Sequence, residues 1–329
     1  MKSVSHELDF TTGEAAMAFI GDTPWHELGF KLVKGSPIED WIKAARMEWE
    51  IIRTSVKYDV ADINSIETFS FPDKDVLYRS DTNTPLSVVS SSYNIVQPKE
   101  ILEFYRDLVG TADMELETAG VLFGGRRFWA LANTGKAVDL KGDIVKGYLL
   151  LTTSCDGTMA TTAQFTSVRV VCNNTLSIAI CDNNTRIRVP HNRVWRPSEV
   201  KDELGFIDRG WEEFSKQIGL LAETIAPRDK AAEFLVRVFG DPTVPIDQQS
   251  SAVTQRCANV WELYIGTGIG SKLESSEHTF WGLVNSVTES IDYHTNHRTT
   301  DARLNGAWYG AGNQLKTKAF EIALEMATR

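Results

Sequence analysis

The chain has 329 residues, of which 42% are hydrophobic and 24% charged, so its composition is that of a globular protein with a sizeable core. Its formal net charge of −10, from 34 basic and 44 acidic residues, argues against a protein that coats duplex DNA by bulk electrostatics. Its four cysteines form no CxxC pair, and its first residues lack a signal-peptide pattern, so we expect free thiols and a cytoplasmic protein without a membrane span.

The first half of the chain carries mostly strand patterns. Proline and acidic residues after Ser36 predict a helix that ends near Glu48, and Pro98 opens a second helix that ends near Leu108. Segments rich in β-branched and aromatic residues predict strands at 50–60, 76–80 and 86–96. Glycine-containing turns at 124–125 and 156–157 predict two antiparallel hairpins, over 114–133 and 144–171.

Helical spacing replaces the strand patterns after residue 198. Apolar residues from Leu204 to Ile225 recur at alternating gaps of three and four, and Pro227 ends this pattern. Such a helix either binds a partner or, as the simpler alternative, packs along its own domain. Further helices are predicted at 228–239, 252–264, 276–291 and 314–327.

These patterns together predict an α+β fold with a curved antiparallel β-sheet and packed helices, followed by a mainly helical C-terminal half. The expected domains are a β-rich α+β domain at 1–197, with an N-terminal arm and helix, and a helical region at 198–329.

Motifs of enzymes and metal sites are weak in this sequence. No GxxxxGK[ST] phosphate loop is present, and the glycines between residues 266 and 270 lack dinucleotide-binding spacing, which favours a linker. His294 and His297 form an HxxH pair near Asp292 and Asp301, for which a polar loop is favoured over a metal site. We therefore predict no catalytic residue, metal or cofactor.

Arginine and aromatic residues alternate in two stretches. Residues 124–129 contain two arginines beside two aromatic residues, and residues 186–196 contain four arginines, a histidine and a tryptophan but no acid. Because side chains alternate across a strand, arginines can face a ligand while apolar neighbours face the core. The predicted nucleic-acid-binding residues are Arg126, Arg127, Trp129, Arg169, Arg186, Arg188, His191, Arg193, Trp195 and Arg196.

This combination is the chemistry of grooves that bind single-stranded nucleic acid. Guanidinium groups follow the phosphates, and aromatic rings stack on bases with a gain of roughly 1–3 kcal/mol per base. The alternative is that residues 186–196 form a solvated edge strand whose arginines pair with acidic residues elsewhere in the fold.

Four stretches resemble an uncharacterised family of phage/plasmid-like proteins, a domain-of-unknown-function group carried by phages, prophages and plasmids. They are residues 24–29 (PWHELG), 90–98 (SSSYNIVQP), 117–129 (ETAGVLFGGRRFW) and 166–176 (TSVRVVCNNTL). The resemblance implies a mobile-element setting and no particular activity. At the level of the expected fold, the chain is also similar to single-strand annealing proteins of the RecT, Redβ and Erf type.

The leading hypothesis is a non-enzymatic phage or plasmid protein that binds single-stranded DNA or RNA and promotes annealing or recombination as a homo-oligomer. The alternative is a protein–protein interaction factor, for counter-defence or host takeover, whose acidic surface engages a host or phage protein. A third hypothesis is an unrecognised nuclease or transferase.

Overall fold

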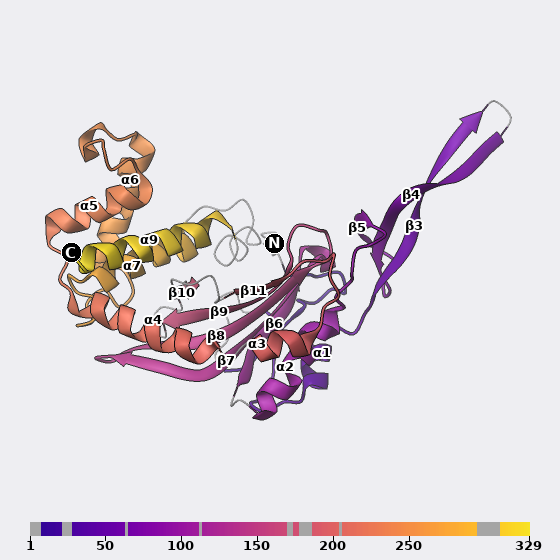
Figure 1. The fold of residues 1–329 in the computed structure, drawn as a ribbon, viewed down its shortest axis with the longest axis horizontal. Helices are drawn as coiled ribbons and strands as arrows, with labels where there is room; N and C mark the ends of the chain where they lie inside the picture. The colour runs from indigo at the N-terminus through magenta and orange to yellow at the C-terminus, as the bar shows by residue number, and fades with distance from the viewer. Residues whose placement is uncertain are drawn as a thin grey trace. The chain divides into compact units, whose positions relative to one another are not determined.

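A computed structural model describes the chain at residues 8–21, 28–62, 65–111, 114–169, 174–177, 186–203, 206–294 and 310–329. The fold is α+β, as predicted, with one large sheet, one three-stranded sheet, and helices mainly in the C-terminal half (Figure 1). None of the helices in these ranges is long and apolar enough to cross a membrane.

The chain forms two compact units, and each is assembled from separate stretches of sequence. The first unit contains residues 1–134, 149–164 and 186–204, and the second contains 135–148, 165–185 and 205–329. The domain boundary predicted between residues 197 and 198 stays a prediction.

The large sheet has the strand order β10-β9-β8-β7-β6-β1-β2, and β11 also pairs with β9. Both predicted hairpins are present: β6 and β7 are joined by a turn with positive φ at Gly124 and Gly125, and β8 and β9 by a turn with positive φ at Gly157. The strands are β1 (Met17–Phe19), β2 (Phe30–Lys31), β6 (Glu115–Leu122), β7 (Arg127–Leu140), β8 (Asp143–Ser154), β9 (Thr161–Arg169), β10 (Asn174–Ser177) and β11 (Arg186–Val189).

The smaller sheet contains β3 (Ile51–Asp62), β4 (Ser65–Arg79) and β5 (Pro85–Ser90), in that order. β5 pairs with β4 only between Lys74 and Tyr78, so beyond it β3 and β4 continue as a two-stranded ribbon (Figure 1). We call the described residues of this ribbon, 57–62 and 65–71, the arm.

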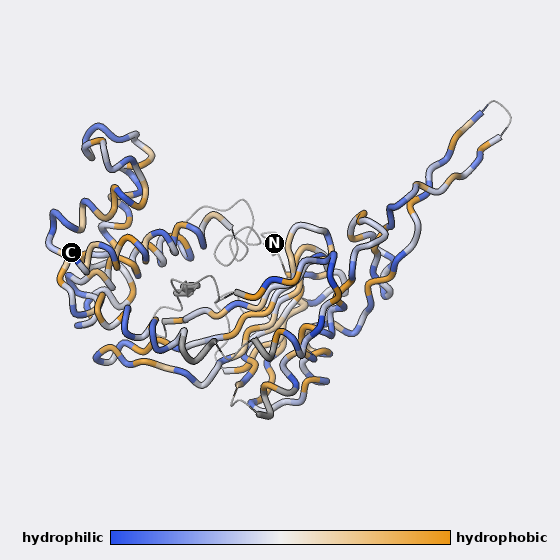
Figure 2. The backbone as a smooth tube through the Cα atoms, viewed as in Figure 1, coloured by the Kyte–Doolittle hydropathy of each residue, from blue (hydrophilic) through white to orange (hydrophobic). Residues whose placement is uncertain are grey.

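The helices of the first unit are α1 (Ile38–Ala44), α2 (Pro98–Thr111) and α3 (Pro197–Glu203). α2 packs on the large sheet through a buried aromatic side chain. Tyr105 of α2 is fully buried, and its hydroxyl lies 2.9 Å from the carbonyl oxygen of Leu149 and 3.1 Å from that of Ala130. These contacts attach α2 to the middle of β7 and β8. The strands beneath are the most continuously hydrophobic part of the sheet (Figure 2).

Helices of the second unit enclose a core of their own. They include α4 (Phe206–Glu223), α5 (Arg228–Phe239), α6 (Ser251–Glu262), α7 (Phe280–Glu289) and α9 (Ala311–Ala327). The helix predicted from alternating gaps is α4, and its Trp211, Phe214, Ile218 and Leu221 are buried. The Phe214 ring lies 5.8 Å from that of Phe320 in α9. The stripe of α4 therefore packs within its own unit, which is the simpler of the two alternatives.

Candidate nucleic-acid interface

The turn between β8 and β9, residues 155–159, brings the two predicted arginine stretches together in the first unit. The backbone N–H of Cys155 donates to the carbonyl oxygen of Arg126 at 2.9 Å. On the other side of the turn, the carbonyl oxygen of Met159 lies 3.2 Å from Nε2 of His191. Residues that are far apart in sequence therefore adjoin one surface loop.

His191 is a buried anchor for this arrangement rather than an exposed ligand. Its Nδ1 lies 2.8 Å from the carbonyl oxygen of Asn94, and its ring stacks on Tyr93 at 4.4 Å. The backbone and side-chain N–H groups of Asn94 donate in return to the carbonyl oxygen of His191, at 2.7 and 3.0 Å. This contact fixes the end of β11 and the following turn against residues 93 and 94.

Burial lowers the pKa of His191, although the carbonyl oxygens of Asn94 and Met159 and the carboxylate of Asp156 act in the opposite direction. Between this lowered pKa and the ordinary value of 6.5, His191 therefore carries a proton more often in the unfolded chain than in the folded chain. The stabilisation from neutral, buried His191 is complete above that value and is lost as the pH falls towards the lowered pKa.

We expect the unfolding midpoint in urea to fall as the pH is lowered from about 7.5 to about 5, and the fall to be smaller in His191→Gln. His278→Asn is the matched control, because His278 is exposed and Asn tolerates its positive φ. Equal pH dependence in the wild type and His191→Gln would contradict this assignment.

Three of the predicted arginines are exposed and have no ion pair with any described residue. They are Arg126 in the turn before β7, Arg188 in β11 and Arg193 in the turn after it. Arg126 donates only to a backbone carbonyl, that of Phe123, at 3.0 Å. We call these three residues, whose segments both adjoin the turn between β8 and β9, the arginine cluster. Arg196 is also exposed, but its guanidinium lies 2.8 Å from the Glu199 carboxylate.

Arg127, Trp129 and Trp195 belong to the core of the first unit. Arg127 lies over the Phe123 ring at 5.0 Å, and its Nη2 donates to the hydroxyl of Thr158 at 3.2 Å. Trp129 is 2% exposed and Trp195 is 8% exposed. Both indole rings are covered by other residues, so a base cannot stack on them in this structure.

Glycine explains how Trp129 is accommodated. A Cβ atom at Gly120, its partner across β6 and β7, would lie 2.1 Å from the indole ring. The Trp195 ring instead packs 5.8 Å from Phe104 of α2.

For two of the predicted residues, the structure describes the backbone but not the side chain. Arg169 pairs with Asn174 at the end of β9, and Arg186 pairs with Gln164 at the start of β11. Their side chains, together with His297 and Asp301, lie outside the described part of the structure. Among the described residues, no group of three or more His, Cys, Asp and Glu side chains is suitably placed to hold a metal ion.

Sequence reasoning predicted a turn at Asp156 and Gly157 but missed the side-chain contacts that hold this turn in place. Asp156 accepts from the backbone N–H of Thr158 at 3.0 Å and from its hydroxyl at 2.6 Å, which closes the turn between β8 and β9. The Tyr93 hydroxyl donates to the carbonyl oxygen of Ser154 at 2.9 Å. The Asp-Gly-Thr sequence is a local signal for the contact of Asp156 with Thr158. The contact of Tyr93 with Ser154 joins segments that are distant in sequence and has no such signal.

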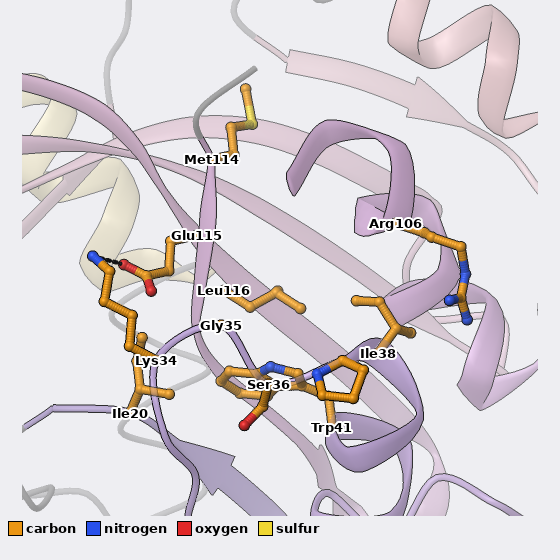
Figure 3. Close-up of a pocket in the computed structure, with 11 residues that line it drawn as sticks. Ile20, Lys34, Gly35, Ser36, Ile38, Trp41, Arg106, Met114, Glu115 and Leu116 are labelled. Atoms are coloured by element: carbon orange, nitrogen blue, oxygen red, sulfur yellow. Dashed lines mark ion pairs between the residues drawn. The ribbon is translucent and has the colours of Figure 1, made fainter. Parts of the chain in front are cut away.

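A pocket of about 550 Å³ lies between α1, α2 and β6 of the first unit (Figure 3). The apolar residues of its floor include Ile38, Trp41 and Leu116. On its rim, Lys34 pairs with Glu115 at 2.6 Å, and Arg106 pairs with Glu39 at 2.8 Å and Glu103 at 2.6 Å. Because both cations already have carboxylate partners, this pocket lacks the uncompensated positive charge of the arginine cluster.

Comparison with known proteins assigns the chain to a family whose function is unknown. No curated protein and no solved structure matches the chain. The family model DUF932, described as a domain of unknown function, matches residues 85–308. The match covers more than half of the 329 residues and includes the turn between β8 and β9 and the whole arginine cluster. The chain therefore belongs to the DUF932 family of proteins.

Proposed function

We propose that this protein binds the phosphate backbone of single-stranded nucleic acid through the arginine cluster. The observation that carries the proposal is that Arg126, Arg188 and Arg193 are exposed and have no carboxylate partner among the described residues, in a chain with ten more acidic than basic residues. Where acids are in excess, three exposed guanidiniums without an ion pair to any described residue favour an external anion as their partner. Phosphate oxygens match the fork of a guanidinium group.

The charge of the whole molecule favours a single strand over a duplex. A duplex has a higher density of phosphates along its axis than a single strand, so it is repelled more strongly by a chain of net charge −10. Since Trp129 and Trp195 are buried, affinity comes mainly from phosphate contacts and is tolerant of sequence.

We place this binding in a phage or plasmid, as a non-enzymatic step in strand annealing or recombination. Support for the setting comes from the four stretches that resemble phage/plasmid-like proteins, two of which contribute residues to the interface. Residues 90–98 include Tyr93 and Asn94, and residues 117–129 include Arg126.

The test is binding of a fluorescent single-stranded oligonucleotide, followed by anisotropy over a series of salt concentrations. Arg188→Ala combined with Arg193→Ala should weaken binding by roughly one order of magnitude or more at low salt. Each lost phosphate contact removes about 0.7 from the slope of log affinity against log salt, so the slope should become shallower by about 1.4.

Arg106→Ala is the matched control, because Arg106 is exposed but paired with two carboxylates. It should leave both affinity and slope unchanged. DNA and RNA oligonucleotides of the same sequence, and the corresponding duplexes, show which nucleic acid is preferred. The proposal fails if the wild type binds no single strand at low salt, or if the control loses as much affinity as the double variant.

A further inference from the structure

The turn between β6 and β7 carries an aromatic side chain next to Arg126 of the arginine cluster. Phe123, the first residue of this turn, is partly exposed, and the following Gly124 is fully exposed. The Phe123 carbonyl oxygen accepts from Nε of Arg126 at 3.0 Å, so the two residues are in direct contact. A ligand that reaches the Arg126 guanidinium therefore also comes close to the Phe123 ring.

Phe123 has a backbone conformation that its side chain disfavours. Its φ is 55°, in the left-handed region, and Gly124 and Gly125 follow with φ of 66° and 98°. Glycine adopts this region readily, whereas a residue with a Cβ atom is destabilised there. A third glycine would suit the backbone of this turn better than phenylalanine does. Residues held in such conformations cluster at ligand-binding sites, which points to a role for the ring beyond the geometry of the turn.

Contacts with two arginines order the ring before any ligand is bound. The guanidinium of buried Arg127 lies over the Phe123 ring, 5.0 Å from its centre. Nη2 of Arg127 also donates to the hydroxyl of Thr158 at 3.2 Å, which fixes the guanidinium against the turn between β8 and β9. A ring that is already ordered loses little further freedom when a ligand packs on it.

We propose that Phe123 stacks on an unpaired base of the nucleic acid whose phosphates bind the arginine cluster. This inference rests on the proposed function and adds a second recognised group, the base, to it. A base within a single strand exposes its flat face, and every base has such a face, so stacking is tolerant of sequence. In a duplex the same faces are covered by neighbouring base pairs, so stacking adds to the preference for single strands.

Fluorescence anisotropy with a single-stranded oligonucleotide tests the stacking. Phe123→Leu keeps an apolar side chain and a Cβ atom at the same φ, and it should weaken binding by about fivefold or more, the lower limit for one stacked base. The slope of log affinity against log salt should not change, because the ring has no charge. Phe123→Tyr keeps the ring and should bind like the wild type.

Phe71→Leu is the matched control, because Phe71 is a phenylalanine of the arm that is 49% exposed and is not part of the arginine cluster. It should bind the oligonucleotide like the wild type. An equal loss of affinity in Phe71→Leu and Phe123→Leu would overturn the assignment of the stacked base to Phe123.

An abasic oligonucleotide of the same length separates stacking from phosphate binding. It keeps every phosphate but has no base, so the wild type should bind it about fivefold or more weakly than the ordinary strand. The wild type and Phe123→Leu should bind the abasic strand equally. If the ring serves only to hold Arg126 in place, Phe123→Leu weakens binding of the abasic strand too, and its salt slope becomes shallower by about 0.7.

The results that overturn the inference differ from those that overturn the proposed function. Equal affinity of the wild type for the ordinary and the abasic strand overturns the stacking, whatever the stability of the variants. Equal binding of the ordinary strand by the wild type and Phe123→Leu does the same. In both cases the arginine cluster still binds phosphates. A wild type that binds no single strand overturns both proposals.

Discussion

Replacing Arg79 with leucine should destabilise the protein by about 3–5 kcal/mol, because it leaves a buried carboxylate without its cation. Arg79 is fully buried, and its Nη1 contacts the carboxylate of Asp9, which is 4% exposed. Its Nε and Nη2 donate to the two oxygens of Asp81 at 2.9 and 2.8 Å. The guanidinium also lies 4.0 Å from the centre of the Trp49 ring.

Denaturation in urea, monitored by tryptophan fluorescence, measures this loss. The double variant Arg79→Leu with Asp9→Leu is compared with the single variant. It removes both buried charges, so part of the lost stability should return. A loss below about 1 kcal/mol in the single variant, the range of surface ion pairs, would contradict the contribution assigned to this buried pair.

Trp195→Ala should be the second strongly destabilising change, at about 3–5 kcal/mol, because it opens a cavity beside Phe104. A base-stacking role for Trp195 makes a different prediction: normal stability and a loss of roughly 1–3 kcal/mol in binding. Because the ring is 8% exposed, we expect the loss to appear in unfolding experiments on the free protein.

Two further variants complete that comparison. Trp195→Phe keeps most of the ring volume and should recover much of the stability. Tyr58→Ala, which removes an exposed aromatic residue, should change the stability of the monomer by no more than about 0.5 kcal/mol. If Trp195→Ala unfolds at the same urea concentration as the wild type, then Trp195 is not a core residue.

Local sequence signals predicted much of the fold. The two glycine turns located the hairpins of the large sheet, and apolar spacing located α4 and α5 to within a few residues. Most of β4 was missed, because the residues between Ser65 and Asp73 are exposed on both faces and include Pro72, so they show no pattern of burial. That Tyr58 and Phe69 share one face becomes known only with the pairing of β3 and β4.

The structure divides the predicted binding residues into exposed and buried ones, which the sequence pattern did not do. Within residues 186–196, Arg188 and Arg193 are exposed. Trp195 is buried instead, because it packs on Phe104 in a distant helix. His191 was assigned to the ligand, whereas contacts with Tyr93 and Asn94 bury it. Tertiary contacts of this kind leave no local signal.

The construction of the arm has a consequence for how this protein can diverge. The described side chains of the arm are exposed to solvent or partly so, and none of them belongs to the core of the first unit. Insertions, deletions and substitutions near the tip therefore leave the folding of the large sheet unaffected. Selection can therefore lengthen, shorten or recharge the arm while the arginine-bearing loops stay constant.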